Sequence, residues 1–357
     1  MPSMISSLQR TSVLFSLMIL IVAAGTLHGA PPLKKAELLV ELPEYCNTPD
    51  GMCLMPDGNI IVAVPNVNDE SQPPVLMKVT PDNRAELFYR CPPHPDTGRA
   101  YPFGVCVDEK GDLYYADLQW FADPENPNYK SRVMRIPMKD GKPGKAYPVA
   151  SGMVVANAII VRDGLLYVSD TTMMPDSKPL TSGVYRIKLQ DECVELKRPL
   201  EKSPYLIATI QTHNPDVPFG ADGLTFDSKG NLYIGNFADG TLHKVEFDAQ
   251  GNPKPAVVFA KEDYMKSCDG IICDTKTDRI YVADSLANAV QIVFPDGTVQ
   301  TLAQEPESDG RNGRLDQPSE PVLRGNEVII SNMDFPVPGG LNTKFEMPNC
   351  LSKITLD

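Results

Sequence analysis

The chain has 357 residues, of which 42% are hydrophobic and 22% charged, a composition typical of a globular protein with a large core. Its net charge of −13 argues against binding to nucleic acid or to anionic membrane surfaces. The 34 prolines and 25 glycines are spread along the chain, which predicts many turns and few long helices.

The first 30 residues have the features of an export signal. Arg10 supplies the positive charge, residues 13–24 form an uncharged apolar segment, and small residues follow at positions 23–25 and 29–30. This apolar segment of 12 residues is too short to span a bilayer, which needs about 20. We therefore predict a signal peptide over residues 1–30, no stable membrane anchor, and a secreted or periplasmic protein. An uncleaved anchor is the alternative.

The eight cysteines suit an oxidising compartment, although their spacing shows no Cys-x-x-Cys motif and no zinc-binding pattern. Cys53, Cys106 and Cys273 lie inside apolar runs, where we expect buried free thiols that act as small hydrophobic side chains. Cys46 and Cys350 could meet if the two ends of the chain come together, but no disulfide is assigned from the sequence.

A unit of about 50 residues recurs six times along the rest of the chain. Each copy begins with a short apolar run, a turn and a second apolar run, most clearly at residues 220–236 (GADGLTFDSKGNLYIGN). The residues that precede the first runs are 53, 54, 65, 47 and 51 positions apart, and they are Asp50, Phe103, Asn157, Asp222, Asp269 and Glu320. Six units at this period predict a propeller or solenoid rather than a doubly wound sheet.

Two further strands are expected in each unit, for example at residues 241–246 and 256–260 in the fourth unit. We therefore predict an all-β fold over residues 33–357, a six-bladed β-propeller with four antiparallel strands in each blade. The sixth unit offers only one strand after its second run, at residues 351–356, whereas the N-terminus has a spare strand at residues 36–42. Pairing these two strands would complete the last blade and protect its edge.

The antiparallel order of the strands would bring acidic and amide side chains to one mouth of the channel. The start of every first strand and the end of every second strand lie on the same face, together with the loops that join second to third strands. The six residues that precede the first strands would form an inner ring. An outer set would end the second strands, and it comprises Asp117, Asp170, Asn236, Asp284 and Asn332. For the outer set we favour a structural role, because Asp and Asn at strand ends bond local backbone groups.

The inner ring would hold four carboxylates and one amide, which would repel one another strongly without a bound cation. Ca²⁺ takes six to eight oxygen ligands, and the ring contains no histidine that would favour a transition metal. We predict Ca²⁺, or another divalent cation, bound by Asp50, Asn157, Asp222, Asp269 and Glu320. Local backbone hydrogen bonding is the alternative role for these side chains.

At these residues the sequence resembles the family of senescence marker protein (regucalcin), gluconolactonase and luciferin-regenerating enzyme, and the related diisopropyl fluorophosphatases. The resemblance covers the chain after the signal segment and is closest at residues 220–245, GADGLTFDSKGNLYIGNFADGTLHKV. It implies a six-bladed propeller with a catalytic Ca²⁺ in its channel, held by a Glu, one or two Asn and an Asp. It also implies hydrolysis of lactones or, in the fluorophosphatases, of P–F and phosphoester bonds.

Three inner-ring residues match the metal ligands of that family. Asp222 in ADG matches the Asp that binds the metal and acts as general base or nucleophile, Asn157 in ANAII matches the Asn of a Pro-Asn-Gly motif, and Glu320 in SEPV matches the Glu. The chain departs from the family at Phe103, where the resemblance implies a further Asn that contacts metal or substrate. Asp50 and Asp269 add carboxylates at positions that are not strictly acidic in the family.

Other side chains could serve a reaction at this mouth. His213 could shuttle protons, and Arg311 and Arg314 could meet an anionic substrate, although solvated loop positions are the structural alternative for all three. Trp120 and Tyr129 could form an aromatic wall or the small core under a long loop.

We carry two functional hypotheses from the sequence. The first is an exported Ca²⁺-dependent hydrolase of the gluconolactonase type, in which Asp222, or a water that it deprotonates, attacks a lactone or related ester. The second is a non-catalytic propeller that binds a sugar, peptide or protein on the same face, a reading that Phe103 favours. The expected partner of the first is a small molecule, such as a lactone or sugar derivative, and the sequence predicts no oligomeric state.

Overall fold

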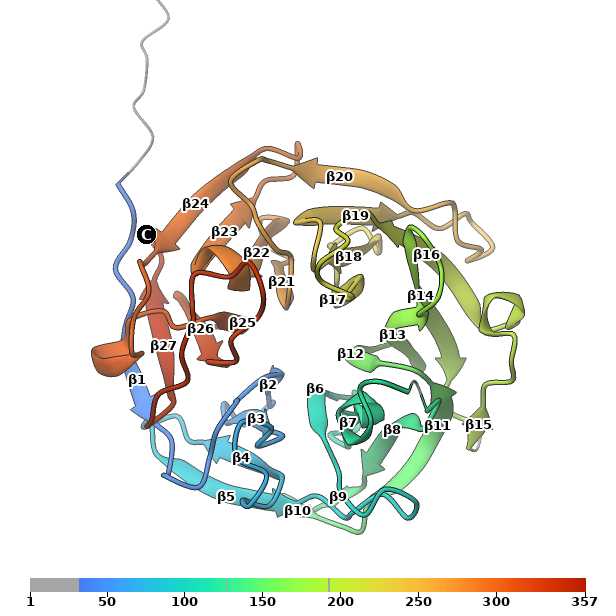
Figure 1. The fold of residues 1–357 in the computed structure, drawn as a ribbon, viewed down its shortest axis with the longest axis horizontal. Coiled ribbons are helices and arrows are strands. Elements are labelled where there is room, and N and C mark those ends of the chain that lie inside the picture. The colour runs from blue at the N-terminus through green and yellow to red at the C-terminus, as the bar shows by residue number, and fades with distance from the viewer. Residues whose placement is uncertain (1–31, 127, 192) are drawn as a thin grey trace, which may run out of the picture. The chain divides into compact units, whose positions relative to one another are not determined.

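The computed structural model describes residues 32–126, 128–191 and 193–357, in which six β-sheets are arranged as blades around a central axis (Figure 1). Leu33–Asp357 form one compact unit. The signal peptide predicted over residues 1–30 lies outside the described residues. No helix among the described residues is long and apolar enough to cross a membrane.

Four blades each consist of four antiparallel strands in chain order, with the first strand nearest the axis (Figure 1). Blade one comprises β2 (Met52–Leu54), β3 (Ile60–Val64), β4 (Val75–Val79) and β5 (Ala85–Arg90). Blade three comprises β12 (Ala156–Arg162), β13 (Leu165–Met174), β14 (Leu180–Lys188) and β16 (Leu206–Thr212). Blade four comprises β17 (Ala221–Phe226), β18 (Leu232–Asn236), β19 (Thr241–Val245) and β20 (Val257–Lys261). Blade five comprises β21 (Ile271–Asp274), β22 (Arg279–Asp284), β23 (Ala289–Val293) and β24 (Val299–Gln304).

The sixth blade is closed by the N-terminal strand. It contains β25 (Pro318–Arg324), β26 (Glu327–Asn332) and β27 (Cys350–Thr355), and β1 (Glu37–Glu41) pairs antiparallel with β27. The predicted closure is therefore confirmed. The backbone groups of β27 thus gain hydrogen-bond partners from the N-terminal strand, which brings this blade to four strands.

Blade two departs from the predicted four antiparallel strands. Its strands β6 (Pro102–Val107), β7 (Leu113–Asp117), β8 (Ser131–Ile136) and β11 (Tyr147–Met153) are joined by β15 (Val194–Glu195), which pairs parallel with β11. The fifth strand comes from the insertion between β14 and β16, which explains the long step of 65 residues before Asp222. The insertion folds over the free edge of β11. A small hairpin of β9 (Met138–Lys139) and β10 (Lys142–Pro143) follows β8.

The hydrophobic core lies between neighbouring blades. One cluster joins Ile61 and Leu76 of blade one to Leu113, Tyr115 and Met134 of blade two. Second strands such as β3 and β7 are buried at every position, because each of their faces is covered by an adjacent blade. This explains why the second apolar runs read as almost continuous hydrophobic stretches rather than alternating ones. All eight cysteines are free thiols, and Cys193 alone among them is exposed.

Each first strand approaches the next one closely at the channel. A Cβ atom at Gly104 would overlap the carbonyl oxygen of Asn157 in the next blade, and one at Gly223 would overlap that of Asp269. The Asp-Gly pairs of the inner ring are therefore not turns but sites of close contact between blades. The pairing register shifts at the same point in blades two, three, four and six, which is a β-bulge at the inner-ring position.

Candidate active site in the propeller channel

Five of the six predicted inner-ring residues line one cavity at the channel mouth, and they are Asp50, Phe103, Asn157, Asp222 and Asp269. Four of the six lie within first strands, whereas Asp50 and Asp269 come just before β2 and β21. Glu320 of β25 lines a second hollow further along the channel, together with Cys53 and Cys273. The sequence pattern therefore located the residues that converge on the axis.

Hydrogen bonds hold the ring side chains in place. The Asn157 amide Nδ2 donates to Asp222 Oδ1 at 2.7 Å, which joins blades three and four across the channel. The Ser285 hydroxyl donates to Asp269 Oδ2 at 2.6 Å, and the Ser319 hydroxyl donates to Asp50 Oδ1. These two serines were not predicted. The sequence gives little basis for predicting them, because a serine next to Asp284 or Glu320 does not differ from serines found at the ends of many strands.

The buried ring carboxyls share a strongly acidic environment. Burial raises the pKa of Asp50 to about 6. The pKa values of Asp222 and Glu320 are both raised well above the usual range, mainly by burial and secondly by the negative charge of Asp50. Burial and the charge of Asp222 do the same to the pKa of Asp269. Among the described residues that line the cavity there is no Lys, Arg or His, so the protein itself offers no cation to balance these groups.

The ring suits a hard divalent cation in charge and in donor type, because carboxylate and amide oxygens are the ligands that Ca²⁺ prefers. Each of three ring acids accepts a hydrogen bond from a different side chain. Among the described residues, three acidic side chains come within 4.8 Å of one another only at Asp316, Asp334 and Glu346, which are not ring positions. Three ring acids would therefore have to move toward one another to bind one ion together.

An aromatic wall surrounds the acidic floor of the cavity, and its rings belong to Phe103, Trp120, Phe121, Phe219, Phe237 and Phe335. Phe121 stacks on Phe103 with ring centroids 5.3 Å apart, and Trp120 meets Phe219 edge-on at 5.5 Å. Trp120 and Phe121 lie in η1 (Gln119–Ala122), in the long loop after β7. Phe103 belongs to β6 and was expected at the inner ring, and Trp120 was expected in an aromatic wall, whereas Phe219 and Phe335 come from other segments and were not predicted.

Four other predicted residues are not among those that line the cavity. His213 is exposed, and its ring Nδ1 lies 3.2 Å from Asp239 Oδ2. Tyr129 packs beneath the Arg198 guanidinium at 4.8 Å from its ring centroid. The remaining two are the arginines of the loop that enters blade six.

These arginines face acidic partners at the edge of the propeller. Arg311 Nε lies 3.7 Å from Asp309 Oδ2, and Arg314 Nε lies 3.4 Å from Glu305 Oε2. Arg311 begins η4 (Arg311–Gly313), which contacts β1 and β27 at the outside of blade six. The placement of η4 against these outer strands accounts for the difference from the predicted substrate contact.

The outer set has the structural role predicted for it. Asp117 Oδ1 accepts the Tyr101 backbone N–H at 2.8 Å, Asp170 Oδ1 accepts that of Val155 at 2.7 Å, and the same pattern recurs in blades five and six. In each case the side chain at the end of a second strand fixes the segment that leads into the first strand of the same blade. The outer set thereby positions the inner ring.

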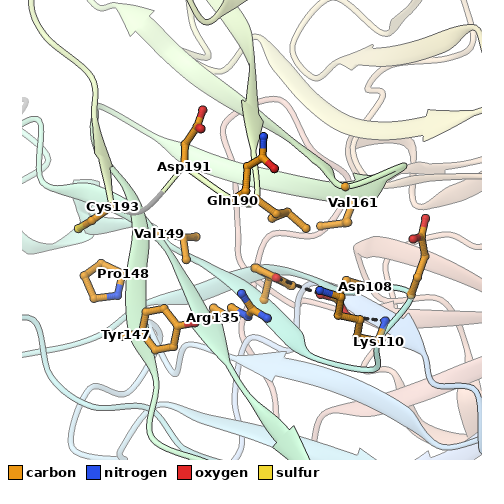
Figure 2. A pocket seen from close by; sticks show the side chains of 14 residues that line it. Asp108, Lys110, Arg135, Tyr147, Pro148, Val149, Val161, Gln190, Asp191 and Cys193 are labelled. Carbon is orange, nitrogen blue, oxygen red and sulfur yellow. Dashed lines mark hydrogen bonds between the residues drawn. The ribbon is translucent and has the colours of Figure 1, made fainter.

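A larger open groove of about 830 Å³ lies away from the channel, between blades two and three (Figure 2). Three of its polar side chains, those of Asp108, Tyr114 and Arg135, already form hydrogen bonds. Asp108 Oδ2 accepts the Tyr114 hydroxyl, Asp108 Oδ1 accepts the Lys110 backbone N–H, and the Arg135 guanidinium binds Asp112. These groups do not converge on a common point, so we place the candidate site in the channel.

Many solved structures share this fold, and three of them illustrate the similarity. Luciferin-regenerating enzyme superposes with a TM-score of 0.61 at 10% identity, over 90% of this chain and 95% of that chain. The PQQ-bound aldose sugar dehydrogenase from Streptomyces coelicolor gives 0.58 at 14% identity, over 92% and 99%. A gluconolactonase from Xanthomonas campestris gives 0.54 at 13% identity, over 93% and 99%. No family model and no curated protein matches the sequence.

The structural matches confirm the predicted resemblance to gluconolactonase and luciferin-regenerating enzyme at the level of the fold. Identities of 10–14% do not transfer an activity to this chain. A dehydrogenase with the same fold shows that the fold alone does not select a reaction. The function must therefore be inferred from the side chains in the channel.

Proposed function

We propose that the protein is an exported, divalent-cation-dependent hydrolase of the gluconolactonase type, acting on small lactones or related esters. The observation that carries this proposal is the convergence of Asp222, Asn157 and further acidic side chains on the floor of an aromatic-walled cavity. Gluconolactonases are among the proteins that share the fold, which is consistent with this reaction class. Export is proposed from the predicted signal segment alone.

Asp222 is the proposed general base or nucleophile. Its carboxylate accepts one hydrogen bond from a described residue, the Asn157 amide, which orients it and leaves lone pairs for a proton from water. A cation held by Asp222, Asn157 and the neighbouring acids would, when bound, polarise the carbonyl and stabilise the oxyanion. The same positive charge would favour ionised Asp222, whose pKa is otherwise raised by burial and by Asp50.

The wall of the cavity favours a substrate with an apolar group beside its ester. Six aromatic rings surround the floor, whereas a bare sugar lactone presents mainly hydroxyl groups that need polar partners. The free volume between the rings is small, about 60 Å³, so an apolar group that enters it would lie directly against the aromatic wall.

The alternative function is binding without turnover, and Phe103 is the observation in its favour. Phe103 stacks on Phe121 at the position where the resemblance implies an Asn that contacts metal or substrate. An apolar side chain there supplies no hydrogen bond to a reacting group. A propeller of this kind would hold its ligand against the aromatic wall and release it unchanged.

A lactone-hydrolysis panel with aliphatic and sugar lactones, run with and without chelator, separates the two functions. We expect activity in the wild type, loss of that activity on chelation, and a fall in kcat/KM of about 10²–10⁴-fold for Asp222→Asn. Asp163→Asn is the matched control, because Asp163 is an exposed turn residue whose φ of 51° suits Asn. Activity that survives both chelation and Asp222→Asn would refute the proposal. Saturable ligand binding without any turnover would support the alternative.

A further inference from the structure

Three acidic side chains meet in the loops of blade six, outside the channel ring. Asp316 lies just before β25, Asp334 just after β26, and Glu346 before β27. Each offers an oxygen within 4.8 Å of the oxygens of the other two. Asp316 is 2% exposed and Asp334 is fully buried, whereas Glu346 is half-buried.

The Asp316 side chain is buried, and one of its carboxylate oxygens, Oδ1, lacks a hydrogen-bond partner among the described residues. Asp334, by contrast, is held in place by the Asn342 amide at 2.8 Å and the Glu346 backbone N–H at 2.7 Å. A buried carboxylate oxygen without a donor is unfavourable, so the arrangement points to a ligand that the protein side chains do not supply.

We propose that Asp316, Asp334 and Glu346 bind one hard divalent cation, Ca²⁺ being the natural candidate, at a site separate from the channel ring. Ca²⁺–oxygen distances of about 2.3–2.6 Å allow ligands on opposite sides of the ion to lie up to about 5 Å apart, which the cluster satisfies. Two positive charges would balance most of the three negative charges. This site does not depend on the hydrolase activity proposed above.

Electrostatics support the assignment. Burial, followed by the charges of Asp334 and Glu346, raises the pKa of Asp316 to about 8. Arg314 acts in the opposite direction on the pKa of Asp316, but its guanidinium also lies 3.4 Å from Glu305 Oε2. The protein therefore supplies only partial compensation for the acids that it gathers here.

The ion would connect two loops that form part of the channel wall. Gln317 and Phe335 both line the cavity, and they directly follow the proposed ligands Asp316 and Asp334 in the chain. The Phe335 backbone N–H donates to Gln317 Oε1, so the two loops already meet beside the cluster. A cation at the cluster would fix the position of the Phe335 ring in the aromatic wall.

Calcium stoichiometry on the full chain tests the proposal. After removal of metal by chelator, equilibrium dialysis with Ca²⁺ should give one ion fewer for Glu346→Gln than for wild type, or an affinity at least tenfold weaker for one ion. Glu307→Gln is the matched control, since Glu307 bonds Thr343 across the same pair of loops but is not part of the cluster. It should bind as wild type does. Unchanged stoichiometry and affinity in Glu346→Gln would overturn the proposal.

Trp120 provides a second readout that separates this site from the ring. It is the single tryptophan of the chain, it contacts Phe121 at 5.2 Å, and Phe121 contacts Phe335 at 5.8 Å between ring centroids. Ca²⁺ titration should change the tryptophan fluorescence of Asp222→Asn, in which the ring is impaired, and should leave that of the double variant Asp222→Asn with Glu346→Gln unchanged at the same concentrations. The same response in both variants would contradict a cation at the cluster. Asp316→Asn serves as a confirming variant. If Asp316→Asn fails to fold, the result for Glu346→Gln decides.

Discussion

The ion pair between Asp117 and Arg132 in blade two is predicted to be a large contributor to stability. Arg132 Nε lies 2.8 Å from Asp117 Oδ2, and the side chains are 8% and 0% exposed. Asp117 also accepts the Tyr101 backbone N–H at 2.8 Å and the Gln119 amide at 2.6 Å. Removing Arg132 would leave a fully buried carboxylate with only neutral donors. Breaking such a pair costs about 3–5 kcal/mol, a large share of the roughly 5–15 kcal/mol that stabilises a typical protein.

The assay is urea unfolding of Arg132→Met beside Arg135→Met, which lies on the same strand. The Arg135 side chain is 22% exposed and pairs with Asp112, so its loss should cost less, on the order of 1 kcal/mol. The double variant Arg132→Met with Asp117→Asn should regain part of the loss, because no buried charge is then left unpaired. A loss below about 1 kcal/mol for Arg132→Met, or equal losses for both arginines, would refute the reasoning.

Three further predictions concern the channel and its supports. Burial raises the pKa of Asp50 from 3.8 to about 6, so with chelator present its contribution to stability is full below pH 4 and is lost as the pH rises through 6. Between pH 4 and 8 the unfolding free energy of Asp50→Asn, measured in urea, should therefore fall by up to about 3 kcal/mol less than that of the wild type. An equal fall in both proteins would contradict the raised pKa of Asp50. Gly104→Ala should lower the unfolding free energy by at least about 1–3 kcal/mol, because the added Cβ overlaps the Asn157 carbonyl; wild-type stability would show that the blades can separate there. Trp120→Ala should raise KM for an aliphatic lactone about tenfold with a smaller change in kcat, and equal falls in affinity for polar and aliphatic lactones would argue against an apolar subsite.

The fold could be predicted from the sequence because propeller repeats are local patterns. The six inner-ring residues, from Asp50 to Glu320, recur at a spacing that matches the length of one blade. The spare strand at residues 36–42 could complete only the sixth blade, which lacked a fourth strand. The inner ring followed from the same geometry, since strand direction alone places Asn157 and Asp222 at one mouth. Their hydrogen bond at 2.7 Å agrees with that expectation.

Loop side chains were harder to predict, because their positions depend on contacts between distant segments. Phe219 and Phe335 belong to different blades and meet the η1 loop only through the folded ring. His213 was expected near the site from its distance in sequence to Asp222, but its bond to Asp239 holds it at the surface. Asp316 and Glu346 likewise come together only when blade six is complete, and their spacing of 30 residues follows no periodic rule.

The pairing of β1 with β27 also constrains the order of events during folding. β1 ends at Glu41, and its partner begins at Cys350, more than 300 residues later in the chain. A strand made early in synthesis must therefore stay unpaired, with open backbone groups, until nearly all of the remaining chain has emerged. Contacts of such long sequence separation form slowly. Partly made chains would then lack both the closed ring and its channel, and would need protection from aggregation until the two ends meet.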